Sequence, residues 1–132
     1  MHPDPKELRA VPLFAELPDE GLQKVASWFE VRHEQEGRRL APEGASGYDF
    51  FVIREGTADV VRGGEVIASL GPGDFFGEMA MMGDGRRVAD VVATSSITVL
   101  DMFGTFFREL ETGMPEVAAR IRAQLEERSA AL

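Results

Sequence analysis

Residues that could hold a small anion are concentrated in one stretch, residues 73–91. Within it, Gly77 follows two phenylalanines, and because it has no Cβ the backbone there can approach a ligand closely. A short helical turn from Glu78 to Met81 would point its unpaired N–H groups and the positive end of its dipole at one place. Arg87, after a glycine-rich loop, offers a planar set of donors that matches phosphate oxygens. The stretch therefore predicts a site for a phosphate group.

The order of these residues resembles the phosphate-binding cassette of the cyclic-nucleotide-binding domain family. That family includes catabolite activator protein, regulatory subunits of protein kinase A and cyclic-nucleotide-gated channels. Its pattern is Phe-Gly-Glu-x-Ala-Leu, a short loop, and then Arg with two small residues. This chain has Phe76-Gly77-Glu78-Met79-Ala80-Met81 and later Arg87-Val88-Ala89. Only the leucine and the first small position differ, so the match is specific.

The resemblance implies a role for each matching position. Arg87 would bind the phosphate and Glu78 would accept a hydrogen bond from the ribose 2′-hydroxyl, while N–H groups at the start of the turn would also contact phosphate. Outside this context, Glu78 would be a solvated carboxylate in a helical first turn and Arg87 a surface arginine. The motif favours the ligand roles. The expected ligand-binding residues are Phe76, Gly77, Glu78, Met79, Ala80, Arg87, Val88 and Ala89.

Val88 bears on the choice of base. In cyclic-GMP-selective relatives a hydroxyl residue follows the cassette arginine and bonds the guanine amino group, whereas Val88 has no side-chain donor or acceptor. The expected ligand is therefore cyclic AMP, with cyclic GMP as the weaker one. No cofactor is expected.

Short β-type segments separated by glycine and proline occupy residues 31–103, a pattern typical of a sandwich or barrel. The clearest of them is a hairpin that turns at Gly63-Gly64. Together with the resemblance, the pattern predicts a mainly β fold with flanking helices, an antiparallel jelly roll (a double-stranded β-helix). We expect a single domain over residues 1–132. Its expected parts are a helical N-terminal segment (5–30), a jelly roll (31–103) that contains the cassette (75–91), and C-terminal helices (104–130).

The helix expected from Pro115 carries a narrow apolar stripe that includes Ile121 and Leu125. Relatives in the resembled family close a C-terminal helix over the base. The resemblance therefore implies a lid formed by Ile121, the stem of Arg122 and Leu125, with Gly113 as a hinge. Binding would be transmitted by movement of this helix. The same stripe would also suit a homodimer.

Composition and missing motifs exclude several other functions. The formal net charge of −9 argues against nucleic acid as a partner of this segment. The chain has no cysteine and only His2 and His33, so neither a thiol nucleophile nor a histidine-rich cupin metal site can be built. No hydrolase elbow, Walker-type phosphate loop or zinc-hydrolase helix is present. We therefore expect a sensor that is not an enzyme.

The polar, proline-containing start of the chain predicts no signal peptide, and no apolar run is long enough for a membrane span. The expected location is the cytoplasm, and the expected partner is an effector domain or protein that is not present in this chain. A second hypothesis remains open: the module could be a nucleotide-insensitive jelly roll that serves only in docking or dimerisation. Intact Gly77, Glu78 and Arg87 count against it.

Overall fold

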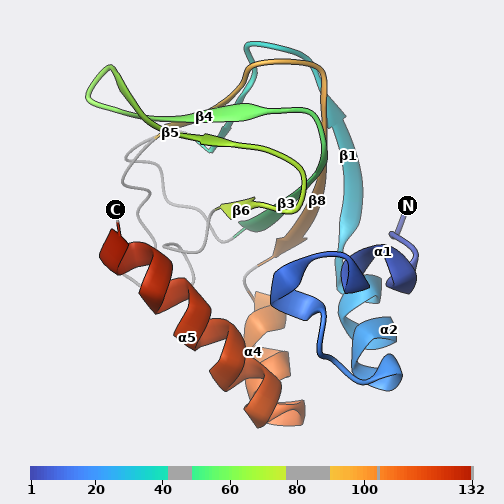
Figure 1. Ribbon diagram of the computed structural model, residues 1–132. Helices are drawn as coiled ribbons and strands as arrows, with labels where there is room; N and C mark the ends of the chain where they lie inside the picture. The colour runs from blue at the N-terminus through green and yellow to red at the C-terminus, as the bar shows by residue number, and fades with distance from the viewer. Residues whose placement is uncertain (42–48, 77–89, 104, 132) are drawn as a thin grey trace.

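Two antiparallel sheets form the body of the protein. The computed structural model describes residues 1–41, 49–76, 90–103 and 105–131. One four-stranded sheet has the order β1 (Glu30–Glu34), β8 (Ile97–Phe103), β3 (Asp49–Glu55), β6 (Phe75–Phe76). The other has the order β2 (Arg39–Ala41), β7 (Asp90–Ala93), β4 (Ala58–Arg62), β5 (Glu65–Leu70). The predicted jelly-roll architecture with flanking helices is confirmed (Figure 1).

Turn glycines set the register of the strands. Gly63 and Gly64 have φ values of 59° and 84° and join β4 to β5 directly after the Arg62–Glu65 pair, so the predicted hairpin is confirmed. Gly56 ends β3 with a φ of 91°, and a Cβ at this position would lie 2.4 Å from the carbonyl oxygen of Ser96. Only glycine fits this contact, which brings the β3–β4 turn against the β7–β8 turn.

Strand β3 is buried on both faces. Phe51 and Ile53 point between the two sheets, where they join a core with residues such as Val60, Val91 and Val99. Phe50 and Val52 point the other way, into a second core formed with the helices. Because side chains alternate along a strand, this single strand belongs to both cores.

The helices lie on one side of the sheets, below the strands in Figure 1. They are α1 (Pro5–Arg9), the 3₁₀ turn η1 (Pro12–Phe14), α2 (Asp19–Trp28), α4 (Thr105–Gly113) and α5 (Pro115–Ala131). Asp4 caps α1 by accepting a hydrogen bond from the Lys6 N–H at 2.9 Å. Trp28 packs against the helical core. No described helix is long and apolar enough to cross a bilayer.

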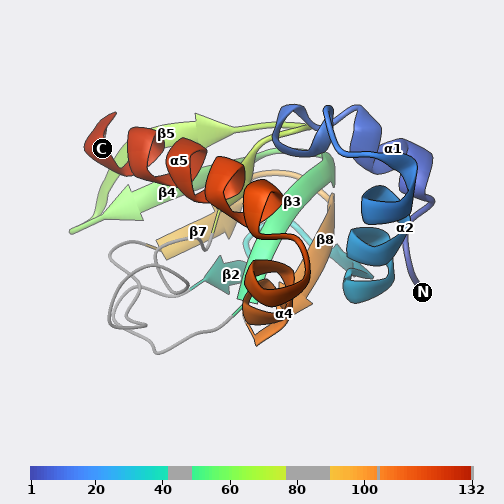
Figure 2. The ribbon, with the colours of Figure 1, turned by 90° about the horizontal axis from the view of Figure 1, so that it is seen from below.

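The C-terminal helix α5 reaches across the molecule. Its C-terminal end lies on the same side as the β4–β5 hairpin in both views (Figures 1 and 2). Its N-terminal part packs on α4, and Ala118 and Ile121 are buried in the helical core with Leu110. The helix thus runs from the helical core toward the side of the β4–β5 hairpin.

Candidate functional site

The predicted cassette begins in one sheet and ends in the other. Strand β6 enters it from the first sheet, where Phe76 pairs with Phe51 of β3. Strand β7 leaves it in the second sheet, where Val91 pairs with Val60 of β4. Between them are the predicted ligand residues Gly77, Glu78, Met79, Ala80, Arg87, Val88 and Ala89, all of which lie outside the described residues. The structure therefore describes the two strands that flank the cassette, β6 and β7, which we call its anchors.

The anchor at β6 is held by stacking and by backbone hydrogen bonds. The Phe76 ring lies 4.7 Å from the Phe51 ring, with an angle of 15° between their planes, and Phe76 is buried. The Gly73 N–H donates to the Ile53 carbonyl at 2.8 Å, and the Ile53 N–H donates to the Asp74 carbonyl at 2.8 Å. These contacts fix the position from which the chain enters the cassette. They give Phe76 a packing role, and its predicted contact with a ligand stays a prediction.

The anchor at β7 is held from both sides. β7 lies between β2 and β4, and its Val91 and Ala93 are buried between the sheets. The Ala93 N–H donates to the Arg38 carbonyl at 3.0 Å, and the Gly37 N–H donates to the Ala93 carbonyl at 2.8 Å. The chain therefore leaves the cassette at a fixed place in the second sheet.

A charged network that the motif analysis missed lies beside the β6 anchor. Arg32 Nη1 donates to Asp101 Oδ2 at 2.8 Å, and Arg32 Nη2 donates to Glu34 Oε1 at 3.0 Å. The Arg32 guanidinium lies 5.8 Å from the centre of the Phe51 ring, within the range of a cation–π interaction. Because Phe51 stacks on Phe76, the network and the cassette anchor share one aromatic ring.

The hydrogen bonds of this network stabilise the charge on Arg32. Burial opposes the charge on Arg32, but its hydrogen bonds to Asp101 and Glu34 outweigh that effect, so the pKa of the guanidinium is raised. The Asp101 side chain is only 11% exposed, and its Oδ1 is buried without a hydrogen-bond partner among the described residues. The alternation of Glu30, Arg32 and Glu34 along one strand face was the available sequence signal. It shows that charges share a face, but it does not show that the face meets Asp101.

Two of the three residues of the predicted lid, Ile121 and Arg122, make other contacts in this structure. Ile121 is 3% exposed and packs in the helical core with Ala118 and Leu110. Arg122 Nη2 donates to Glu111 Oε2 at 2.8 Å. Leu125 belongs to α5, but its side chain is outside the described part of the chain. Closure of α5 over a ligand therefore stays a prediction, and it would require Ile121 to leave its present contacts.

Metal chemistry has no evident site in the described ranges. No group of three or more histidine, aspartate or glutamate side chains there is arranged to hold a metal ion. The carboxylates near the β6 anchor are engaged by Arg32 instead.

Comparison with known proteins gives a family match that includes the predicted cassette. The family described as cyclic nucleotide-binding domain matches residues 31–112. The cGMP-dependent protein kinase of Drosophila melanogaster (isozyme 2, forms cD5/T2) is 32% identical over 121 residues, 86% of this chain and 13% of the kinase. The cAMP-dependent protein kinase regulatory subunit of Colletotrichum orbiculare is 33% identical over 105 residues, 78% of this chain and 27% of that subunit.

A solved structure is similar to this chain over most of its length. The catabolite activator protein of Thermus thermophilus is similar to this chain with a TM-score of 0.81 and 30% sequence identity. The similarity covers 91% of this chain and 59% of that one. The chain thus spans a small part of the two curated relatives and over half of this structural neighbour.

The Arg32 network leads to a prediction about stability. Replacing Asp101 with alanine leaves Arg32 partly buried with one acceptor fewer, so we expect the free energy of unfolding to fall by about 1 to 3 kcal/mol. Glu16→Ala is the matched control because Glu16 also pairs with an arginine, Arg120 at 3.0 Å, but is 78% exposed. Its loss should stay below about 1 kcal/mol. Urea denaturation of both variants measures the difference, and equal losses would show that the Asp101 pair behaves as a surface pair.

Proposed function

The chain belongs to the cyclic nucleotide-binding domain family, and from this premise we propose that it is a cyclic AMP sensor whose C-terminal helix transmits binding. The observation that carries the proposal is the pair of anchors, because β6 and β7 hold the two ends of a segment that contains Gly77, Glu78 and Arg87. A cyclic nucleotide offers that segment a phosphate and a ribose hydroxyl. In this proposal the domain is regulatory and does not catalyse a reaction.

Each proposed contact follows from the chemistry of the side chain. Arg87 supplies a charged, planar set of donors to the phosphate, and Glu78 supplies an acceptor to the ribose 2′-hydroxyl. Gly77 allows the ligand to approach the backbone, and the N–H groups of Met79 and Ala80 add donors from a helical turn. The overall charge of the chain is −9, so a ligand anion must be attracted by this local group of donors.

The choice of base rests on Val88. The relatives include both a cGMP-dependent kinase and a cAMP-dependent kinase regulatory subunit, so similarity alone does not select one nucleotide. Val88 follows Arg87 and offers no hydrogen bond to the guanine amino group. On binding, the guanine amino group would lose its hydrogen bonds to water without gaining one from the Val88 side chain. This supports cyclic AMP as the preferred ligand.

The proposed signal uses α5 and has an energetic cost that can be estimated. The ion pairs Arg122–Glu111 and Arg120–Glu16 are largely exposed, and each contributes at most about 1 kcal/mol. Removing Ile121 from the helical core costs about 1.5 to 3 kcal/mol unless it is buried again. A shift from mostly open to mostly closed needs about 5.5 kcal/mol of differential ligand affinity. The contacts that α5 would break are therefore within the range that a bound ligand can offset.

The proposed setting is cytoplasmic, where cyclic nucleotides act as signals, and the proposed partner is an effector on another part of the protein or on another chain. The curated relatives are a kinase and a kinase regulatory subunit, and this chain covers 13 and 27% of them. Dimerisation through the α5 surface is a further arrangement that this proposal allows.

The first test of the function is calorimetric titration of the purified chain with cyclic AMP. Arg87→Ala should weaken binding by roughly 30-fold to several thousand-fold, because truncating one partner of a hydrogen-bonded charge pair costs about 2 to 5 kcal/mol. Glu78→Ala should weaken it by about 10- to 100-fold, since one charge-assisted bond contributes about 1.5 to 3 kcal/mol. Arg86→Ala is the control and should bind nearly as the parent does.

Two outcomes would contradict this assignment. If Arg86→Ala weakened binding more than Arg87→Ala, the register of the loop would be wrong. If the parent chain bound neither cyclic AMP nor cyclic GMP, the docking module would be the better description.

A competition experiment tests the preference for base. Labelled cyclic AMP bound to the parent chain should be displaced by unlabelled cyclic AMP at lower concentration than by cyclic GMP. Val88→Thr introduces a hydroxyl next to Arg87. The affinity for cyclic GMP relative to that for cyclic AMP should then rise by about five- to tenfold, the effect of one neutral hydrogen bond. A parent chain that favours cyclic GMP would refute the argument from Val88.

Amide hydrogen exchange tests the role of α5. Addition of cyclic AMP should slow exchange in residues 77–88 and also in residues 115–126, because a helix that closes on the ligand loses local opening. A chain truncated after Gly113 should bind cyclic AMP more weakly. Protection confined to the cassette, together with unchanged affinity after truncation, would mean that α5 does not take part.

A further inference from the structure

A row of four side chains crosses the first sheet and ends at the cassette. Each strand contributes one member, in the order Arg32 (β1), Asp101 (β8), Phe51 (β3) and Phe76 (β6). Phe51 stands directly opposite Asp101 on one side and Phe76 on the other, so these three residues share a face. Phe51 and Phe76 belong to the core between the sheets. The row ends one residue before Gly77 of the cassette motif.

The strand at the end of this row is a short anchor. β6 has two residues, Phe75 and Phe76, and lies at the edge of its sheet. A two-residue edge strand has few ladder hydrogen bonds, so side-chain contacts contribute much to holding it in place. On the inner face, the Phe76 ring stacks on the Phe51 ring at 4.7 Å. A shift of the Phe51 ring would therefore move Phe76 and the residue that follows it.

Arg32 restrains the Phe51 ring from the other side. Its guanidinium lies 5.8 Å from the ring centre and comes from the β8 side, whereas Phe76 comes from the β6 side. The guanidinium is bonded at two ends, to Asp101 at 2.8 Å and to Glu34 at 3.0 Å. A planar group held at two ends has little freedom to rotate. The Phe51 ring therefore lies between a fixed cation and the Phe76 ring.

We propose that Arg32 is a positioning residue for the nucleotide site, which acts through Phe51 and Phe76 and does not touch the ligand. This inference rests on the proposed function, because it assigns Arg32 an effect on the affinity for cyclic AMP. Without the cation the Phe51 ring has more accessible positions, and so has Phe76. The apparent affinity then falls in proportion to the fraction of molecules in which the anchor is correctly placed.

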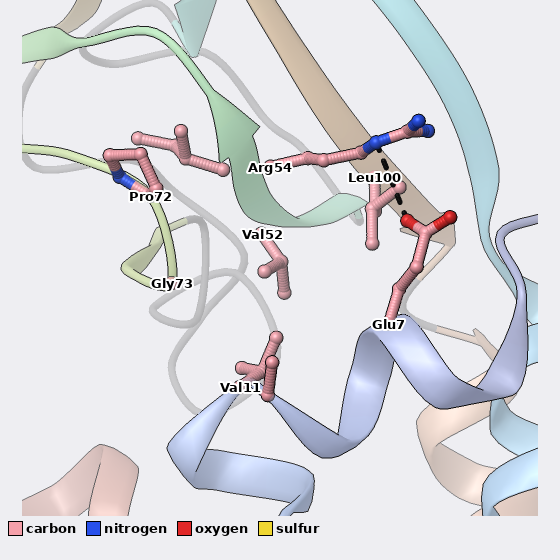
Figure 3. A pocket seen from close by; sticks show the side chains of 9 residues that line it. Glu7, Val11, Val52, Arg54, Pro72, Gly73 and Leu100 are labelled. Carbon is pink, nitrogen blue, oxygen red and sulfur yellow. Dashed lines mark ion pairs between the residues drawn. The ribbon is translucent and has the colours of Figure 1, made fainter.

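The opposite face of β3 provides a matched arginine. Arg54 points toward Glu7 of α1, away from the row, as Figure 3 shows, and its Nε lies 3.4 Å from Glu7 Oε2. The Arg54 side chain is 36% exposed, and that of Arg32 is 35% exposed. Both arginines thus lie on the same sheet, carry the same charge and pair with a carboxylate. They differ in that Arg32 contacts the aromatic pair.

Calorimetric titration with cyclic AMP compares Arg32→Met with Arg54→Met. Arg32→Met keeps an apolar stem but removes the cation, so binding should weaken about two- to fivefold, the factor that corresponds to one cation–π contact at a partly exposed site. Arg54→Met should stay within about 1.5-fold of the parent, because a screened surface charge has little effect at physiological ionic strength. Urea denaturation checks that both variants are folded. A variant that is about 99% folded loses only about 1% of its apparent affinity through unfolding, so lower stability alone does not produce the expected change.

A double-mutant cycle tests the route through Phe51. In a Phe51→Leu background the cation has no ring to restrain, so adding Arg32→Met should change binding by less than about 1.5-fold. Direct attraction between Arg32 and the ligand would instead give the same loss in both backgrounds.

The ring protons of Phe76 give a second readout, which needs no nucleotide and no substitution at Phe51. Because Phe76 stacks on Phe51, movement of the Phe51 ring changes the NMR chemical shifts of the Phe76 ring. Arg32→Met should shift these signals, and Arg54→Met should leave them in place.

The inference is overturned if the parent chain binds cyclic AMP and Arg32→Met binds it equally well, or if Arg32→Met and Arg54→Met lose the same affinity. It is also overturned if the loss in Arg32→Met persists without the Phe51 ring, or if the Phe76 signals do not move. A parent chain that binds no cyclic nucleotide would refute the proposed function first, and this inference with it.

Discussion

Burial of β3 on both faces is the constraint on which the rest of the structure depends. Phe51 and Ile53 complete the core between the sheets, while Phe50 and Val52 complete the core under the helices. A strand in this position cannot slip by one residue, because the two sets would exchange cores. Its pairing with β8 and β6 therefore fixes the helices and the start of the cassette relative to the same backbone.

Charge is arranged locally in a chain that is acidic overall. Arg32 is held by Asp101 and Glu34 beside Phe51, so a positive charge stands next to the ring that supports Phe76. The carboxylates around Arg32 largely neutralise it, which keeps it from acting as a free anion site. An anion bound in residues 77–89 would therefore depend on Arg87 and on backbone donors, while Arg32 serves the packing of the aromatic pair.

Local signals were sufficient for much of the fold. Gly63-Gly64 predicted the β4–β5 turn because only a residue free to adopt positive φ suits that hairpin, and Pro115 predicted the start of α5. The cassette motif identified candidate ligand-binding residues, and their roles stay predictions; of these residues the structure describes Phe76, which is buried and stacks on Phe51. Contacts between distant segments were beyond such signals. The apolar stripe of α5 predicted that Ile121 would pack against another surface, but it did not show that this surface is the helical core.

The backbone of Ile53 connects the helical side of β3 to the start of the cassette. Its carbonyl accepts from the Gly73 N–H, and its N–H donates to the Asp74 carbonyl directly before β6. The neighbouring side chains face opposite cores, with Val52 in the helical core and Ile53 between the sheets. A displacement of this turn would therefore disturb the helical core and the cassette entrance together.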